Sequence, residues 1–261
     1  MERIGDLLLD RVLPSAPKRP ASLLFVHGMW GGSWLFERSL ALAAGAGWEA
    51  WAINLRGHHG SRPVADLGRV RLADYVRDVT DALQKIGPVI VIGYSMGGLL
   101  AQMVAARPEV RAAAFMVSAA PRGIVALRWP VVRRLRRYAG ALLRSRPFRL
   151  DDADTVDLML NRLNPERHAA LLQRLTEESG RVARELAFAP PAVDAARIRC
   201  PTLVVGASDD RITPAAVQRR IARKYGSDYL EARGHGHMFI IEDGGEATFR
   251  QALGWMERAM R

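Results

Sequence analysis

The feature that most restricts the fold of this chain is an alternation of short apolar runs with longer amphipathic stretches. Strands buried on both faces appear as continuous apolar runs, and the sequence has such runs at 22–27, 49–54, 89–93, 113–118, 202–207 and, more weakly, 228–232. Helical periodicity occurs at 34–46, 72–86, 97–107, 214–225 and 245–259. This alternation predicts a mostly parallel, doubly wound sheet of the α/β class.

One long segment, 122–190, breaks the alternation because it has helical patterns without a convincing strand. In a doubly wound sheet, an insertion at this point lies over the carboxyl ends of the strands, where ligands bind. We therefore predict a core formed by 1–121 and 191–261, with 122–190 as a helical cap.

Two of the predicted helices have start signals. Ser33 is the expected N-cap of the helix at 34–46. Thr213 and Pro214 supply an N-cap and a first-turn proline for the helix that follows them.

The composition is that of a globular protein. Of 261 residues, 49% are hydrophobic, but no apolar run approaches the ~20 residues that a membrane-spanning helix needs. The apolar run at 7–9 is too short for the centre of a signal peptide. A single cysteine, Cys200, excludes an internal disulfide and a multi-cysteine metal site. We expect a cytoplasmic protein without stable membrane insertion, in which Cys200 is a buried thiol.

The net charge of +11 is concentrated in one segment, where nine arginines and no acids lie between Arg122 and Arg149. The pattern over 129–144 predicts an amphipathic helix with Pro130 in its first turn. Its apolar face carries Val132, Leu135, Tyr138, Ala139, Leu142 and Leu143. Its basic face carries Arg133, Arg134, Arg136, Arg137 and Arg144.

We interpret this segment as a cap helix whose arginines are solvated. Attraction of anionic substrates or of membrane surfaces is the second interpretation. Nucleic-acid binding is disfavoured, because no aromatic platform and no known nucleic-acid fold accompanies the patch.

A lone serine, Ser95, stands between glycines at the end of a predicted buried strand. The stretch Gly-Tyr-Ser-Met-Gly at 93–97 follows that strand and precedes a helix, as in the G-x-S-x-G nucleophile elbow. Such a turn projects its serine from the sheet edge beside a helix N-terminus, whose free N–H groups suit a developing oxyanion. The alternative is a glycine-rich turn with a capping serine.

A serine nucleophile needs a general base, and the base needs an acid that orients it. The loop after the last predicted strand offers His235 and His237, and the loop after the strand before it offers Asp209 and Asp210. All four follow strand ends at the same edge of the predicted sheet as Ser95.

On these residues the chain resembles the α/β-hydrolase superfamily, in the branch of small serine esterases and hydroxynitrile-lyase-like enzymes. The order serine, aspartate, histidine is that of the superfamily. The resemblance covers about 20–120 and 200–260. It implies the α/β-hydrolase fold, with a helical cap inserted after the sixth strand.

The resemblance also selects among the candidate acids and bases. The family's D-R-x-x-P pattern fits the residues from Asp210 onward, so Asp210 is preferred over Asp209. The family's histidine follows a glycine and has an acid five residues later. His237 with Glu242 fits that pattern better than His235 does.

The stretch FVHGMWGGSW at 25–34 is similar to the family's first oxyanion element. This similarity makes the N–H of Met29 one expected oxyanion donor, with Trp30 as the weaker candidate. The second expected donor is the N–H of Met96, directly after the nucleophile. The similarity gives His27 a structural role in holding the loop.

Other branches of the superfamily differ at single positions. Haloalkane dehalogenases and epoxide hydrolases carry Asp where this chain has Ser95. Plant-type hydroxynitrile lyases typically have Thr before the oxyanion residue and Lys after the histidine, where this chain has Gly28 and Met238. The turn NLRGHHGS at 54–61 is similar to the family's R-G-H-G-x-S turn with one residue shifted, and we expect it to be scaffolding.

The resemblance implies a serine hydrolase that cleaves a small-molecule acyl ester through an acyl-enzyme, without a cofactor or metal ion. Lactones, thioesters, amides and C–C bonds stay open because the same triad cleaves them. A catalytically inactive binding module is the alternative from another class. We expect no nucleic-acid partner, and we consider a homodimer. Four cap residues could line an acyl pocket or form the core of the cap: Met159, Leu160, Leu163 and Phe188.

Overall fold

The computed structural model of the chain describes residues 1–15, 19–126 and 129–261, and its centre is an eight-stranded sheet. The strands are β1 (Glu2–Ile4), β2 (Leu7–Val12), β3 (Ser22–Val26), β4 (Ala50–Asn54), β5 (Val89–Tyr94), β6 (Val110–Met116), β9 (Thr202–Ala207) and β10 (Asp228–Ala232). They lie in the order β1-β2-β4-β3-β5-β6-β9-β10. Neighbours pair in parallel except β1 with β2 and β2 with β4. The predicted α/β class and mostly parallel sheet are confirmed.

Helices cover both faces of this sheet. One face packs against α1 (Glu37–Gly45) and α10 (Gly245–Ala259), and the other against α2 (Leu72–Ile86), α3 (Met96–Val104) and α9 (Ala215–Tyr225). Alternate side chains of a strand point to opposite faces, so Leu23 and Phe25 of β3 join the first core while Leu24 and Val26 join the second. Burial on both faces explains why the strands appear as continuous apolar runs.

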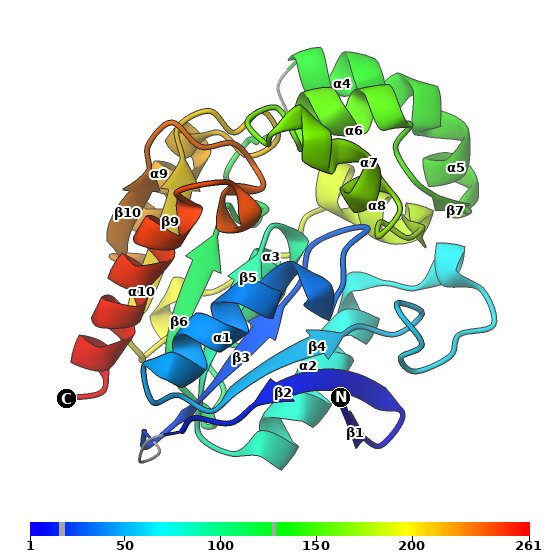
Figure 1. Cartoon of the computed structure of the whole chain (residues 1–261). Helices are drawn as coiled ribbons and strands as arrows, with labels where there is room; N and C mark the ends of the chain where they lie inside the picture. The colour runs from blue at the N-terminus through cyan, green and yellow to red at the C-terminus, as the bar shows by residue number, and fades with distance from the viewer. Residues whose placement is uncertain (16–18, 127–128) are drawn as a thin grey trace.

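Most of the chain between β6 and β9 forms a group of short elements at the end of the sheet to which the parallel strands point (Figure 1). They are α4 (Trp129–Leu135), the 3-10 turn η3 (Arg136–Tyr138), α5 (Ala139–Arg144), β7 (Pro147–Phe148), α6 (Asp152–Leu158), η4 (Pro165–Arg167), α7 (His168–Leu172), β8 (Glu178–Ser179) and α8 (Gly180–Phe188). The 3-10 turn η5 (Ala195–Arg197) follows this group and precedes β9. The group follows the sixth strand. The exact division into a core and a cap at 122–190 stays a prediction.

This group, called the cap below, is fastened to the rest of the molecule at several points. The indole N–H of Trp30 donates to the Phe148 carbonyl at 3.2 Å, and the Trp30 carbonyl accepts from the N–H of Thr176 at 3.0 Å. On another side, the side-chain amide of Asn161 donates to the Asp209 carbonyl at 3.0 Å. The cap therefore holds a defined position over the strand ends.

The antiparallel hairpin of β1 and β2 was not predicted from the sequence. The apolar run at 7–9 begins β2, in which Leu7 and Leu9 are buried and Leu8 is half-buried. β2 lies between the edge strand β1 and β4. Only alternate residues at its start are fully buried, and its apolar run stops after three residues, which is too short to indicate a strand.

The single helix predicted over 129–144 is wrong, because the 3-10 turn η3 divides it into α4 and α5. Leu142 is buried as expected, but Leu143 is 69% exposed and does not belong to the packed face. The side chains of Pro130 and Leu135 lie outside the described residues.

Some arginines of this segment are paired with acids of α6 rather than only solvated. Arg134 contacts Asp154 at 3.5 Å and also binds Asp157, and Arg137 contacts Asp154 at 3.3 Å. Arg128 lies outside the described residues. The nine positive charges are therefore partly neutralised within the cap.

Both predicted helix caps are wrong. Ser33 begins the 3-10 turn η1 (Ser33–Phe36), and its hydroxyl accepts a hydrogen bond from the Asn54 side chain at 3.0 Å. Pro214, not Thr213, is the N-cap residue of α9, and no side chain caps that helix. Two further 3-10 turns lie outside the cap, η2 (Leu67–Arg69) and η6 (Phe239–Ile241).

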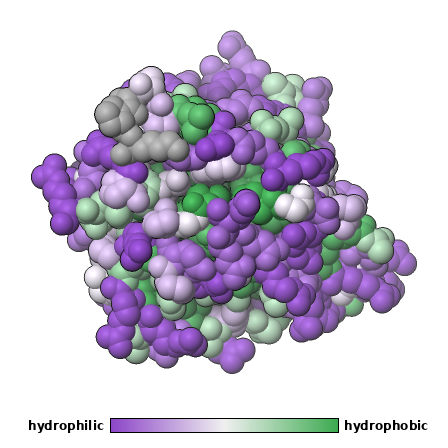
Figure 2. Space-filling model, turned by 90° about the horizontal axis from the view of Figure 1, so that it is seen from below, coloured by the Kyte–Doolittle hydropathy of each residue, from purple (hydrophilic) through white to green (hydrophobic). Residues whose placement is uncertain are grey.

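The surface seen from below, away from the cap, is mostly hydrophilic with small hydrophobic areas (Figure 2). No helix in the described part of the chain is long and apolar enough to cross a membrane. Cys200 is half-buried rather than fully buried, with its Sγ 3.5 Å from the Ala105 carbonyl, and burial raises the pKa of its thiol.

Candidate active site

Ser95 lies in a sharp turn that joins β5 to α3. Its backbone φ of 56° is rare for a residue with a side chain, and such strain is typical of functional turns. The flanking glycines are required by space. A Cβ on Gly93 would lie 2.1 Å from the Gly97 carbonyl oxygen, and a Cβ on Gly97 would lie 2.1 Å from the Val26 carbonyl oxygen. The turn thus holds Ser95 directly in front of the first N–H groups of α3.

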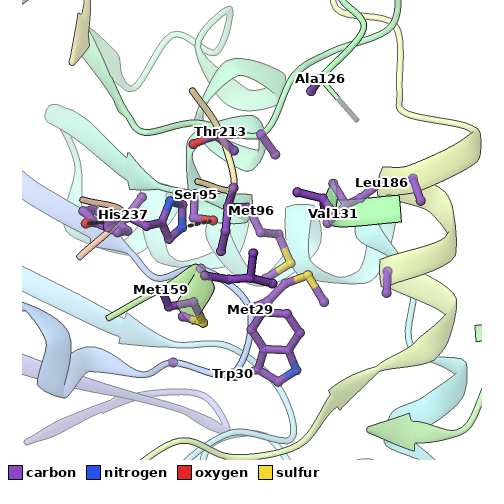
Figure 3. A pocket seen from close by; sticks show the side chains of 18 of the residues that line it. Met29, Trp30, Ser95, Met96, Ala126, Val131, Met159, Leu186, Thr213 and His237 are labelled. Atoms are coloured by element: carbon purple, nitrogen blue, oxygen red, sulfur yellow. Dashed lines mark hydrogen bonds between the residues drawn. The ribbon is translucent and has the colours of Figure 1, made fainter. Parts of the chain in front are cut away.

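Ser95, His237 and Asp210 form a continuous hydrogen-bonded line. Ser95 Oγ lies 3.0 Å from His237 Nε2, and His237 Nδ1 lies 2.8 Å from Asp210 Oδ2 (Figure 3 shows the first contact). An ionised carboxylate only accepts, so Nδ1 carries the proton and Nε2 is free to accept from the serine hydroxyl. His237 is 2% exposed and Asp210 is 5% exposed.

The carboxylate of Asp210 is fixed by more than the histidine. Its Oδ1 accepts from the backbone N–H groups of Ile212 and Thr213, both at 2.8 Å, and its Oδ2 accepts from the Thr213 hydroxyl at 2.9 Å. Burial acts to raise the pKa of Asp210, but the charge and hydrogen bond of His237 and the hydrogen bonds of Thr213 outweigh it, and the pKa is lowered. Asp210 therefore stays ionised near neutral pH.

The other two candidates lie apart from Ser95. Asp209 pairs with Arg162 at 3.2 Å near the surface. His235 Nδ1 lies 3.0 Å from Glu242 Oε2, and the Glu242 carboxylate also accepts from the N–H of Gly236 at 3.0 Å. Glu242 is thus an acid that holds the loop before His237 and not the partner of His237 itself.

Two residues that hold the Ser95, His237 and Asp210 side chains in place were not predicted from the sequence. Thr213 binds the carboxylate of Asp210, whereas the sequence pattern favoured a helix cap at that position. The hydroxyl of Tyr94, the residue before Ser95, donates to the carbonyl of His237. The position of Tyr94 inside the G-x-S-x-G stretch indicates that it is near the nucleophile. That position does not indicate that its hydroxyl binds the carbonyl of His237.

The loop at 28–32 passes directly beside Ser95, because a Cβ on Gly28 would lie 2.8 Å from Ser95 Cβ. His27 anchors this loop: its Nδ1 donates to the Gly28 carbonyl at 2.8 Å, and its Nε2 accepts from the N–H of Leu55 at 3.1 Å. Burial and the nearby His58 lower the pKa of His27 well below its ordinary value. A neutral ring fits this pattern of one donor and one acceptor.

Met29 in this loop and Met96 at the start of α3 both line the space in front of Ser95. Among the described residues, neither backbone N–H donates to a protein acceptor. The same holds for the N–H of Trp30, so the preference for Met29 over Trp30 still rests on the resemblance. These free donors are available to an oxygen of a bound molecule.

The turn at 54–61 contains a fully buried histidine, His58, whose ring lies beside that of His27. His58 Nε2 lies 3.4 Å from Glu178 Oε2, and the hydroxyl of Tyr75 donates to Glu178 Oε1 at 2.6 Å. His58 Nδ1 donates to the Arg56 carbonyl at 3.0 Å. Because Glu178 belongs to β8 of the cap, this turn ties the cap to the core, as expected for scaffolding.

A cavity of about 440 Å³ lies in front of Ser95 and reaches under the cap (Figure 3). No charged side chain is among the described residues that line it. The cap contributes apolar side chains that include Val131, Leu142, Phe148, Leu158, Met159 and Leu186.

Of the four cap residues considered for an acyl pocket, Met159 lines the cavity. Leu160 and Leu163 are buried in the surrounding hydrophobic core, and Phe188 is 73% exposed. Helical periodicity shows that a residue is on a packed face, but it does not show whether that face meets the core or a cavity.

The site has no evident place for a metal ion. Within residues 1–15, 19–126 and 129–261, no group of three or more His, Cys, Asp or Glu side chains is arranged to hold one. The reactive groups of the described site are the serine hydroxyl, the imidazole, the carboxylate and the free N–H groups.

Comparisons with known proteins show the family of the chain. A sequence model described as the alpha/beta hydrolase family matches residues 23–251. A protein of Klebsiella pneumoniae (strain 342), named as a candidate carbamate hydrolase, RutD, is 29% identical over 229 residues, which is 83% of each chain. A protein of Oryza sativa subsp. indica named "Probable esterase PIR7A" is 31% identical over 105 residues, 38% of this chain and 39% of its own.

The fold also matches solved structures. A thermophilic esterase from Thermogutta terrifontis, with malate bound, superposes with a TM-score of 0.76 at 19% identity, over 98% of this chain and 94% of the other. At this identity the match shows a common fold.

Proposed function

Because the chain belongs to the α/β-hydrolase family and is a hydrolase, we propose that it cleaves carboxylic esters through an acyl-enzyme on Ser95. The observation that carries the proposal is the line from Ser95 through His237 to Asp210, with contacts of 3.0 and 2.8 Å. The partial match to a protein named as an esterase supports an ester over other acyl bonds.

In the first step, Ser95 Oγ attacks the carbonyl carbon of the ester. His237 Nε2 accepts the hydroxyl proton as the bond forms, and the imidazolium is stabilised by the carboxylate of Asp210. The strong hydrogen bonding of Asp210 favours this, because it keeps the carboxylate ionised and the Nδ1 proton in place.

The carbonyl oxygen becomes an anion in the tetrahedral intermediate. In this proposal, the N–H groups of Met29 and Met96 donate to this anion. No protein hydrogen bond has to break for this, because neither N–H has a protein acceptor among the described residues. Loss of one such donor typically raises the barrier by about 3–4 kcal/mol.

The intermediate collapses when His237 gives its proton to the oxygen of the leaving alcohol. The acyl group then remains on Ser95 Oγ. A water molecule takes the place of the alcohol, loses a proton to His237 and releases the carboxylic acid by the same path.

The same groups can attack a thioester, a lactone, an amide, a carbamate or an activated C–C bond. The name of the RutD relative makes a carbamate the first competitor. An inactive binding module is disfavoured, because the hydrogen bonds from Ser95 to Asp210 are all in place.

The test is a comparison of kcat/KM on p-nitrophenyl esters, a phenyl carbamate, an acyl-CoA thioester, a lactone and a p-nitroanilide. The wild-type protein is expected to prefer the esters, and Ser95→Ala is expected to lose about 10⁵–10⁶-fold in kcat. A higher kcat/KM on another acyl bond would show that the reaction class is wrong. No turnover of any substrate would support the binding module.

A further inference from the structure

Resting on the proposed ester hydrolysis, we infer that the acyl group of the substrate is an uncharged hydrocarbon of medium length, held under the cap between Ser95 and Leu186. Three features carry this inference: the direction in which the acyl group must extend, the chemistry of the walls, and the pairing of the nearby arginines.

The position of His237 fixes the direction of the acyl group. The leaving oxygen has to face His237 Nε2 to receive its proton, so the acyl group extends from Ser95 to the opposite side. In Figure 3, Ser95 lies between His237 on one side and Val131 and Leu186 on the other. Val131 belongs to α4 and Leu186 to α8, so the acyl group enters the part of the cavity that the cap encloses.

No charged side chain is among the described residues that line the cavity. The indole N–H groups of the two tryptophans among the described lining residues already have hydrogen-bond acceptors. The indole N–H of Trp30 donates to the Phe148 carbonyl at 3.2 Å, and that of Trp34 donates to His59 Nε2 at 3.2 Å.

Thr213, the remaining polar side chain besides Ser95 and His237, is also engaged. Its hydroxyl lies 2.8 Å from the Val117 carbonyl and 2.9 Å from Asp210 Oδ2. A carboxylate at the far end of the acyl group, away from the N–H groups beside Ser95, would lose its water without gaining a charged side-chain partner among the described lining residues, which is strongly unfavourable.

The arginines of the cap do not change this conclusion. Arg134 and Arg137 bind Asp154, and Arg149 binds Asp152 at 2.7 Å. No arginine is among the described residues that line the cavity. A cation for the far end of an anionic acyl group is therefore lacking in the described part of the cap.

The size of the cavity sets the length. About 440 Å³ is within the range of pockets that enclose small organic ligands, and an acetyl group would leave most of it empty. Each methylene buried there is expected to raise kcat/KM by roughly fourfold, until the chain reaches the far wall.

The experiment compares p-nitrophenyl acetate, hexanoate and mono-p-nitrophenyl adipate. The last two have acyl chains of six carbons and differ at the far end, which is a methyl group in one and a carboxylate in the other. Hexanoate has four more methylenes than acetate, so it is expected to exceed acetate in kcat/KM by about 250-fold if all four are buried. It is expected to exceed adipate by about 100-fold, because the adipate carboxylate finds no partner.

Leu186→Lys places a cation at the far wall, and the residue is half-buried, so a longer polar side chain can be accommodated. The hexanoate-to-adipate ratio is expected to fall by at least about tenfold in this variant. Leu143→Lys is the matched control, because Leu143 is an exposed cap leucine that does not line the cavity. It should keep the wild-type ratio. If Leu186→Lys does not fold, Leu186→Trp should shift the preference to shorter acyl chains.

The outcomes separate the two proposals. If no ester is hydrolysed in a Ser95-dependent way, the proposed function fails and this inference fails with it. If acetate is hydrolysed by Ser95 but hexanoate is not preferred, or adipate matches hexanoate within about threefold, only the acyl-group inference is overturned.

Discussion

Glu178 of the cap and His58 of the core are fully buried against each other, with 3.4 Å between Glu178 Oε2 and His58 Nε2. The hydroxyl of Tyr75 completes the contact from α2, and the ring of His27 lies beside that of His58 at 5.2 Å between centroids. Burial acts to lower the pKa of His58, but the charge of Glu178 and the hydrogen bond to the Arg56 carbonyl outweigh it, and the pKa is raised above 6.5. A buried contact between an acid and a histidine therefore joins the cap to the core.

The first prediction concerns the pH dependence of this pair. A group with a raised folded-state pKa contributes stability that is complete below its unfolded pKa, 6.5, and is lost as the pH rises through the folded pKa. Glu178→Gln is expected to lower the free energy of unfolding by about 3 kcal/mol at pH 6 and by less at pH 9. Urea unfolding at the two pH values measures this.

Glu177→Gln is the matched control, because Glu177 is the exposed neighbour of Glu178. It should change the stability little at either pH. A loss in Glu178→Gln that is equal at pH 6 and pH 9 would show that the pair is not charged at low pH.

The second prediction separates the two aspartates. Asp210→Asn keeps the shape of the side chain but lets the imidazole adopt the wrong tautomer, so kcat should fall on the order of 10⁴-fold. Asp209→Asn weakens surface contacts with Arg162 and the Ser208 hydroxyl and should change kcat by less than about threefold. Ester hydrolysis at neutral pH distinguishes them, and equal losses would contradict the role of Asp210.

The third prediction separates the two histidines. His237→Ala should be as severe as Ser95→Ala, because the members of a triad act as a unit. His235→Ala should lose less than about tenfold, since its ring contacts Glu242 and not Ser95. The assignment is wrong if His235→Ala is the inactive variant. Thermal melts of both proteins check that neither has unfolded.

The fourth prediction concerns the arginines of the cap. Replacing Arg133, Arg134, Arg136 and Arg137 together with Gln should change kcat/KM on neutral esters by less than about threefold, because none of them lines the cavity. Salt should have little effect on the wild-type enzyme, although it screens charges over ~10 Å at 0.1 M. A preference for anionic esters that disappears in high salt and in the variant would instead show electrostatic steering.

Much of the fold could be predicted from the sequence because its central strands are buried on both faces. The run at 202–207 matches β9 from end to end, and the helix at 72–86 matches α2. The hairpin of β1 and β2 escaped prediction, because in β2, next to the edge strand β1, only alternate residues such as Leu7 and Leu9 are buried. The break at η3 also escaped, since helical periodicity continues through it.

The sequence motifs predicted the candidate catalytic residues, but they did not predict the contacts that hold these residues in place. The glycines around Ser95 mark the elbow because the backbone leaves no space for a Cβ at Gly93 or Gly97. The partner of Thr213 could not be predicted, because a threonine before a proline is equally typical of a helix start. The pairing of His58 with Glu178 joins residues 120 positions apart, and neither local pattern points to the other.

The central claim is that Ser95 is the nucleophile, activated by His237. Its most direct test is covalent trapping with a fluorophosphonate, followed by mass spectrometry of the peptides. The account predicts one label per chain, on Ser95, with labelling abolished in Ser95→Ala and strongly slowed in His237→Ala. A label on another residue, or an enzyme that hydrolyses esters but takes no label on Ser95, would contradict it.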